Sequence, residues 1–263
     1  MKDRPPTRSV EEELEGYRTA LTQLESIQTH YSHLVDKLMA DLEGEKARSD
    51  ALLRNVLPER IIDRLNAGEA TISDRFDDVA IVFSDLVGFT EMSIALDPAR
   101  VVGFLNDLFS RFDQMSADLG VEKIKTIGDA YMAASGLLDR RMDHLDTAVD
   151  LALGMQAALV EVNASTGNAW SMRVGVHAGP VMAGIIGTRK YVYDVWGDTV
   201  NTASRLQTTA PPGAVHLTRA VAERLESERF ALTGHGTIEL KGKGLVETCC
   251  AVARGATSMP KAT

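Results

Sequence analysis

The stretch VAIVFSDLVGFT, from Val79 to Thr90, decides the fold of this 263-residue chain. Ala80 to Phe83 form a short apolar run, which predicts a buried strand. Ser84 and Asp85 end the run, and Gly88 allows the backbone to turn. An acid at this position is either an ordinary surface residue or a metal ligand, with nearby backbone carbonyls as further oxygen donors. The residues around Asp85 leave both interpretations open.

A second acid, Asp129, lies in a segment whose pattern predicts a hairpin, because two β-like runs flank Gly128-Asp129. Apolar residues that recur on one face predict a helix from about Pro98 to Leu119, between the two acids. A strand, a helix and a return strand can bring both carboxylates to one sheet edge, where they repel unless a cation lies between them. Such oxygen ligands suit Mg²⁺ or Mn²⁺ rather than zinc. The alternative is a plain turn aspartate.

Composition limits the classes of partner and the compartment. The net charge of -9 argues against nucleic acid and against an anionic membrane surface. No apolar run approaches the roughly 20 residues that span a bilayer, and the N-terminal residues have no apolar signal core. We therefore expect a cytoplasmic protein. Cys249 and Cys250 are adjacent, so they cannot close an ordinary disulfide loop, and we expect them to be buried strand residues.

A heptad pattern precedes the globular part of the chain. Ten of its 13 seam positions are apolar and the flanks are charged, which predicts a parallel homodimeric coiled coil. The alternative is a long amphipathic helix that packs on its own domain. Gln28 and Glu45 in the seam would cost stability and could fix the register. One seam is Leu14, Leu21, Gln28, Val35, Leu42, Ser49 and Val56, and the other is Tyr17, Leu24, Tyr31, Leu38, Glu45 and Leu52.

Strands and helices alternate in the rest of the chain, with hairpins among them. This predicts an α/β (α+β) sandwich, with a mixed central sheet and flanking helices. We expect residues 178–181 to form a turn, and Asp198 to be the N-cap of a helix that ends at Thr209. The predicted parts are a disordered tail (1–10), the coiled coil (11–57), a short helix and linker (58–74), the globular domain (75–254) and a second tail (255–263).

Basic and amide side chains could converge on the acid pair. Lys125 lies four residues before Asp129 on the same predicted strand, so the two share a face. Asn201 and Arg205 lie four apart on one predicted helix and project together. Each could also be an ordinary surface residue, but a paired-acid site with convergent basic groups is what phosphoryl or nucleotidyl transfer needs. Two further candidates are Arg173, on a predicted strand, and Lys241, in a glycine-flanked turn.

Four motifs together closely resemble the class III nucleotidyl cyclases: FSDLVGFT, EKIKTIGDAYMAASG, MRVGVHAGPVMAGIIG and YDVWGDTVNTASRLQ. They are long, ordered and correctly spaced from about residue 78 to 252, so the signal is far stronger than a short pattern. The resemblance implies that Asp85 and Asp129 bind two divalent metal ions (Mg²⁺ or Mn²⁺), with the Leu86 carbonyl as a further ligand.

The resemblance also implies a substrate. Lys125 and Asp194 match the two positions that read the purine base, where adenylyl cyclases carry Lys and Asp (or Thr) and guanylyl cyclases typically carry Glu and Cys. This pattern favours ATP. Asn201 and Arg205 match the pair that positions the ribose and stabilises charge at the α-phosphate. Arg173 and Lys241 match the groups that hold the β- and γ-phosphates.

In this family the active site lies between two cyclase domains, and this chain has one such domain with every matched position filled. The expectation is an adenylyl cyclase that works as a head-to-tail homodimer with two equivalent sites. The alternatives are a guanylyl cyclase, a non-catalytic nucleotide-sensing or dimerisation module, and a coiled-coil scaffold. Long helices ahead of such domains often follow a sensor or membrane anchor, so the chain could also be the cytosolic part of a membrane-anchored cyclase.

Overall fold

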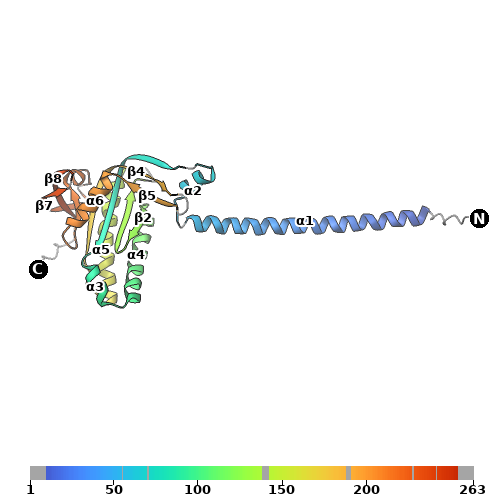
Figure 1. Cartoon of the computed structure of the whole chain (residues 1–263), viewed down its shortest axis with the longest axis horizontal. Coiled ribbons are helices and arrows are strands. Elements are labelled where there is room, and N and C mark those ends of the chain that lie inside the picture. Colours follow the sequence, from blue (N-terminus) through green and yellow to red (C-terminus); the bar gives the residue numbers. More distant parts are fainter. Residues whose placement is uncertain are drawn as a thin grey trace, which may run out of the picture. The chain divides into compact units, whose positions relative to one another are not determined.

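The computed structural model describes residues 10–54, 56–69, 71–137, 142–187, 191–226, 228–240 and 242–253. The chain divides into two compact units, Met1–Gly68 and Glu69–Thr263. The first unit contains α1 (Val10–Arg54) and α2 (Glu59–Asn66). α1 is one continuous 45-residue helix in which no residue is buried (Figure 1). The predicted N-terminal helix is therefore confirmed, and its pairing into a coiled coil stays a prediction.

The second unit is built on an eight-stranded sheet. The strand order is β2-β3-β1-β4-β6-β8-β7, and β5 pairs with β4 outside this path. Only the β4–β6 pair is parallel among the described pairings. The predicted mixed sheet with flanking helices is confirmed (Figure 1). The elements are β1 (Ser73–Leu86), α3 (Phe89–Ala95), α4 (Pro98–Leu119), β2 (Glu122–Ile127), β3 (Ala130–Ser135), α5 (His144–Thr166), β4 (Met172–Ile186), β5 (Val192–Trp196), α6 (Asp198–Thr209), β6 (Val215–Thr218), α7 (Arg219–Ala222), β7 (Phe230–Leu240) and β8 (Gly244–Ala253).

The two faces of β1 are covered by different helices. Ala80 and Val82 point into the main core, which the apolar faces of α4 and α5 cover. Alternate residues of a strand point to opposite faces, so Ile81 and Asp85 lie on the other face, which α6 covers. The predicted candidate acid thus lies on the face of the sheet that carries α6.

Two glycines of β4 allow α6 to lie directly on the sheet. A Cβ atom at Gly175 would come within 2.2 Å of the Gln207 backbone nitrogen and 2.4 Å of the Ala203 carbonyl oxygen. A Cβ at Gly179 would come within 2.9 Å of the Thr199 hydroxyl. All three distances are too short for a real Cβ contact, so the glycines of the motif MRVGVHAG determine how closely the helix approaches.

Two local predictions are wrong. Residues 178–181 do not turn, because β4 runs unbroken and pairs with β1 as far as Gly184. Pro180 fits there because the register of β1 shifts between Phe76 and Val79, opposite the proline, so no ladder bond is needed from its missing N–H. Asp198 is not the N-cap of α6: Gly197 occupies that position, and Asp198 is the first residue of the helix.

The described part of the chain also contains no helix that combines the length and the apolar character needed to cross a bilayer. The buried strand positions predicted for Cys249 and Cys250 are confirmed, since both lie buried on β8 as free cysteines.

Candidate active site

The acid pair forms where β1 ends and where β2 turns into β3. Asp85 is the penultimate residue of β1 and is half-buried. Asp129 lies in the hairpin turn after Gly128, whose backbone has a φ of +64°, a conformation that favours glycine. The spacing predicted Asp129 on the same strand as Lys125. That prediction is wrong, because β2 ends at Ile127 and Asp129 lies in the turn. The two carboxyl groups are close enough for Asp129 to raise the pKa of Asp85, so the fold brings the two predicted acids together.

The surroundings of Asp85 make its charged form costly. Burial is the largest effect and the neighbouring Asp129 the next, and together they raise the pKa of Asp85 from 3.8 to about 6. The Gln207 side chain and Arg173 act in the opposite direction. The amide of Gln207 donates to Asp85 Oδ2 over 3.4 Å. A divalent cation between the carboxylates would relieve the repulsion that raises this pKa.

Arg173 lies beside the acid pair with unused hydrogen-bonding capacity. It is the cross-strand partner of Asp85 in the β1–β4 ladder. Its Nε atom is buried and has no hydrogen-bond partner within the described residues. A buried, unsatisfied guanidinium nitrogen is expensive unless a ligand completes it, so the position suits an anionic group such as a phosphate.

The donor set fits Mg²⁺ or Mn²⁺ in the manner typical of nucleotide enzymes. The described residues contain no cluster of three or more His, Cys, Asp or Glu side chains that could hold a metal alone. They offer two carboxylates, Asp85 and Asp129, and the adjacent carbonyl of Leu86 at the end of β1. Mg²⁺ is commonly held by one or two carboxylates together with substrate phosphates and waters, so this incomplete set is suitable.

A separate ion pair joins β2 to β5. Lys125 Nζ lies 2.5 Å from Asp194 Oδ2. The other oxygen of Asp194 accepts from the Val195 backbone N–H over 2.8 Å. Asp194 is 14% exposed and Lys125 is 33% exposed, so the pair is partly shielded from water. The sequence placed these residues 69 positions apart, and the fold brings them into direct contact.

Asn201 and Arg205 lie on the side of α6 that faces away from the sheet. The buried residues of the helix are Thr199, Thr202, Ala203, Leu206 and Gln207. Asn201 is exposed and Arg205 is half-buried. The two therefore share one face, as predicted, but this is not the face that Gln207 presents to Asp85. In the described residues, the hydrogen bonds and ion pairs of Lys125 and Asp194 do not reach the acid pair either.

Sequence reasoning missed one residue of this site and named one that lies outside the described residues. Gln207 was not predicted, although it contacts Asp85. Its position two residues after Arg205, on the buried side of the same helix, gave no separate signal. Lys241 lies outside the residues that the structure describes.

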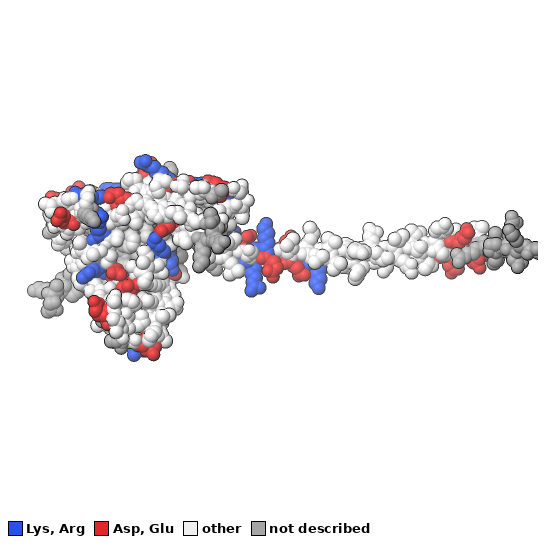
Figure 2. All heavy atoms as spheres, in the orientation of Figure 1, with Lys and Arg blue, Asp and Glu red and all other residues white. Residues whose placement is uncertain are grey.

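The visible face of the second unit shows no broad basic surface among the described residues. On the face shown in Figure 2, acidic and basic side chains are interspersed over the second unit. A polyanionic ligand would therefore depend on individual basic residues such as Arg173.

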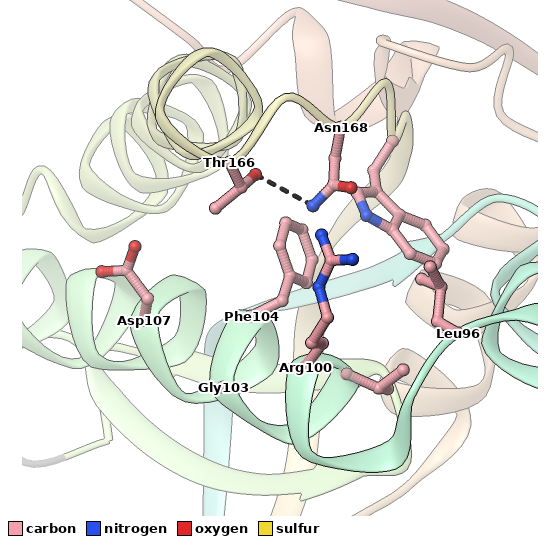
Figure 3. A pocket seen from close by; sticks show the side chains of 9 residues that line it. Leu96, Arg100, Gly103, Phe104, Asp107, Thr166 and Asn168 are labelled. Carbon is pink, nitrogen blue, oxygen red and sulfur yellow. Dashed lines mark hydrogen bonds between the residues drawn. The ribbon is translucent and has the colours of Figure 1, made fainter.

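A separate cavity of about 320 Å³ lies beside the start of α4 (Figure 3). Phe104 and Trp170 are among its apolar lining residues, and Arg100 and Asn168 are among its polar ones. None of the predicted site residues lines it.

Comparison with known proteins identifies the family. The model of the adenylate and guanylate cyclase catalytic domain matches residues 71–252. A protein of Mycobacterium tuberculosis named adenylate cyclase is 41% identical over 222 residues, which cover 84% of this chain and 50% of that protein. The guanylate cyclase soluble subunit beta-2 of Rattus norvegicus is 38% identical over 205 residues, which cover 78% of this chain and 30% of that protein. The chain thus spans half or less of the length of these curated relatives.

A solved structure agrees with this match. The catalytic core of a rhodopsin-guanylyl cyclase with converted specificity, in complex with ATPαS, superposes with a TM-score of 0.65 at 34% identity. The superposition covers 69% of this chain and 98% of that one. The sequence match, the sheet and the paired acids agree, and the chain belongs to the class III nucleotidyl cyclases, the family of adenylate and guanylate cyclase catalytic domains.

Proposed function

We propose that this protein is an adenylyl cyclase that converts ATP to 3′,5′-cyclic AMP and pyrophosphate. The observation that carries the proposal is the contact of 2.5 Å between Lys125 and Asp194, at the two positions that the resemblance assigns to base recognition. A Lys donor meets N1 of adenine, and an Asp acceptor meets the exocyclic amine. Guanine presents a carbonyl and a protonated ring nitrogen at that edge, which this pair matches poorly.

The acid pair and Arg173 serve the triphosphate. Asp85, Asp129 and the Leu86 carbonyl hold two divalent ions, Mg²⁺ or Mn²⁺, through oxygen atoms. When bound, such ions supply Lewis acidity at the ribose 3′-hydroxyl and at the phosphates. Arg173, whose buried Nε lacks a partner among the described residues, donates to the β- and γ-phosphates together with Lys241.

The reaction is an intramolecular displacement. The 3′-oxygen gives its proton to water and forms a bond to the α-phosphorus, while the bond from that phosphorus to the bridging oxygen breaks and pyrophosphate leaves. Asn201 orients the ribose, and Arg205 stabilises the negative charge that develops on the α-phosphate. No covalent intermediate with the enzyme is needed.

The two groups of residues belong to different halves of a shared site. Asn201 and Arg205 project from the side of α6 opposite to the sheet, whereas Asp85 lies on the sheet beneath that helix. In a single chain, Asn201 and Arg205 would have to move to the opposite side of α6 to reach a nucleotide bound at the acid pair of the same chain. A head-to-tail dimer avoids this, because the acids of one copy meet the helix of the other, which gives two equivalent sites.

The first unit serves the same dimer. Residues 11–57 form a parallel coiled coil with a second copy, residues 58–74 link it to the enzyme, and residues 75–254 form the catalytic domain. The apolar seam of α1 is exposed in the single chain, and a second copy would cover it. The coil would hold the two catalytic domains at high effective concentration.

The principal alternative is a guanylyl cyclase. Relatives named guanylate cyclase match at nearly the same identity as the adenylate cyclase, so overall similarity does not choose between the nucleotides. The choice rests on Lys125 and Asp194 alone, because the Glu and Cys typical of guanylyl cyclases are absent from those positions.

The test is product formation from ATP and, separately, from GTP with Mn²⁺, for the wild type and for Asp85→Ala. Cyclic AMP from the wild type alone is the expected result. A predominance of cyclic GTP would overturn the assignment of the base-reading pair. A folded, dimeric protein that makes neither product would contradict the enzymatic function and favour a nucleotide-sensing or scaffold role.

A further inference from the structure

A short ion pair ties the turn between β7 and β8 to the first residue of α6. Lys243 Nζ lies 2.6 Å from Asp198 Oδ2. Lys243 precedes β8, and its backbone N–H closes the turn by donating to the Leu240 carbonyl over 2.8 Å. Gly242 has a φ of +86°, so the tight geometry of this turn depends on glycine. The pair therefore joins the tip of an edge hairpin to the helix that carries Asn201.

Packing and a side-chain hydrogen bond hold the start of α6 to β4, and the contact with Lys243 links the same turn to a different hairpin. An aspartate at a helix start normally caps the helix, but α6 has no side-chain cap, and the carboxylate of Asp198 is directed to Lys243. The backbone bond from Asn201 to Gly197 is long, at 3.3 Å. One hydrogen bond of 2.7 Å from the Thr199 hydroxyl to the Pro180 carbonyl holds the first turn to β4. Lys243 supplies a further tether, to the β7–β8 hairpin.

The same charges act on the buried strand beneath the helix. His177 lies on β4 between the two glycines on which α6 packs, and its Nδ1 atom lies 3.2 Å from the Thr218 hydroxyl. Burial is the largest effect and Lys243 the next, and together they lower the pKa of His177 from 6.5 to about 4, whereas Asp198 acts in the opposite direction. The imidazole is therefore neutral near pH 7, and it adds no competing positive charge next to the pair.

We propose that the Lys243–Asp198 ion pair is a positioning device for the cyclase reaction, which locks the β7–β8 turn to the start of α6. The inference rests on the proposed function for its effect on catalysis. Lys243 does not touch the substrate; it acts through Asp198 on the helix that presents Asn201 and Arg205. Without the pair, the helix start and the turn move independently, and the site loses its geometry in the transition state.

The first experiment measures position directly and does not depend on activity. Hydrogen exchange is compared for wild type, Lys243→Met and a matched control, Arg219→Met. Arg219 forms an ion pair of 2.9 Å with Glu223, the residue that follows α7. The side chains of this pair are 44% and 62% exposed, against 29% for Lys243 and 70% for Asp198. The proposal expects at least threefold faster exchange at residues 240–244 and 197–201 in Lys243→Met alone. Unchanged exchange in both segments would overturn it.

The second experiment uses the same variants in the cyclase assay. We expect Lys243→Met and Asp198→Asn each to lower kcat/KM for ATP about tenfold or more, mainly through kcat, and the double variant to lose no more than either. Lys243→Arg should retain most activity. The variant with the exchanged pair, Lys243→Asp with Asp198→Lys, should recover at least half of the kcat/KM that Lys243→Asp alone loses. Additive losses, or an exchanged pair as inactive as Lys243→Asp, would show that Lys243 acts on the substrate itself and would overturn the positioning role.

The two experiments separate this proposal from the proposed function. If the wild type forms no cyclic nucleotide, the enzymatic assignment fails, while the exchange data still decide whether the pair fixes the two elements. If the wild type is active and the exchange pattern holds, but Lys243→Met keeps full kcat/KM, the catalytic part of the positioning role is wrong and the cyclase assignment stands.

Discussion

The ionised carboxylate of Asp85 destabilises the metal-free fold, and the same carboxylate is a proposed metal ligand of the enzyme. Its pKa of about 6 means that, between about pH 4 and 6, the folded chain retains a proton that the unfolded chain has released. Stability from this group therefore falls as pH rises through that window. Above pH 6 the ionised, half-buried carboxylate costs on the order of 2 kcal/mol. Cation binding would recover this energy, which links the stability of the fold to the occupancy of the site.

The first prediction concerns Asp85→Asn, which removes the costly charge but keeps the shape. Without metal at pH 8, this variant should be more stable than wild type, by up to about 2 kcal/mol, and the difference should vanish near pH 4. Mn²⁺ should raise the Tm of wild type and not that of the variant, which should also be inactive. Thermal unfolding with and without Mn²⁺ measures both effects.

The control for this prediction is Asp118→Asn, at an exposed aspartate on α4. It should follow the wild type in every respect. If Asp85→Asn responds to Mn²⁺ as strongly as wild type does, Asp85 is not a ligand.

The second prediction concerns Lys125 and Asp194, which must be changed together because a single change leaves a partly buried charge without its partner. Lys125→Glu with Asp194→Cys should lower kcat/KM for ATP by about a hundredfold or more, and should yield measurable cyclic GTP from GTP. Rates with both nucleotides measure this change. An unaltered preference for ATP would show that other residues read the base.

At the scale of the elements, the approach of α6 to β4 sets the position of Asn201 and Arg205. Gly175→Ala places a methyl group 2.2 Å from the backbone of Gln207, so the helix must shift or the fold must lose stability. We expect a loss of about 2–4 kcal/mol in the free energy of unfolding, together with most of the activity. Chemical denaturation and the cyclase assay measure the two effects.

The matched control is Gly236→Ala on β7. Apart from its two chain neighbours, no described residue has a heavy atom within 4 Å of a Cβ at that position, and its φ is not in the left-handed region. It should change stability by less than about 1 kcal/mol. If the two alanine variants behave alike, close packing of α6 on Gly175 is not what holds the helix.

The sequence predicted α4 from Pro98, where a proline suits the first turn of a helix, to Leu119, and it predicted the end of α6 at Thr209. It assigned the N-cap of α6 to Asp198, whereas the structure has Gly197 there. The continuous β4 was missed because Ala178-Gly-Pro-Val has the composition of a turn, and only the bulge of β1 opposite Pro180 makes it a strand. The partners of Asp198 and Asp85 were missed for a similar reason. Lys243 and Gln207 are distant in sequence, and local pattern cannot show which residue the fold brings to a carboxylate.

At the scale of the whole molecule, α1 is a long helix with an exposed apolar seam. Leu24 is 62% exposed and Leu38 is 59% exposed in the single chain. Introducing aspartate at both positions should abolish pairing through the coil and make specific activity depend strongly on protein concentration. Sedimentation velocity and activity over a dilution series measure this.

Its control places aspartate at Ile27 and Leu34, which are also exposed apolar residues of α1 but lie outside the predicted seam. The control should remain dimeric and active at low concentration. If it dissociates as readily as the seam variant, the predicted register of the coil is wrong.

The most direct test of the central claim mixes two inactive chains, Asp85→Ala and Asn201→Ala, and measures cyclic AMP formed from ATP. Random pairing gives half mixed dimers, each with one intact site of two, so an equimolar mixture should regain about a quarter of wild-type activity. A mixture as inactive as either parent, with mixed dimers shown to form, would contradict a site shared between two copies.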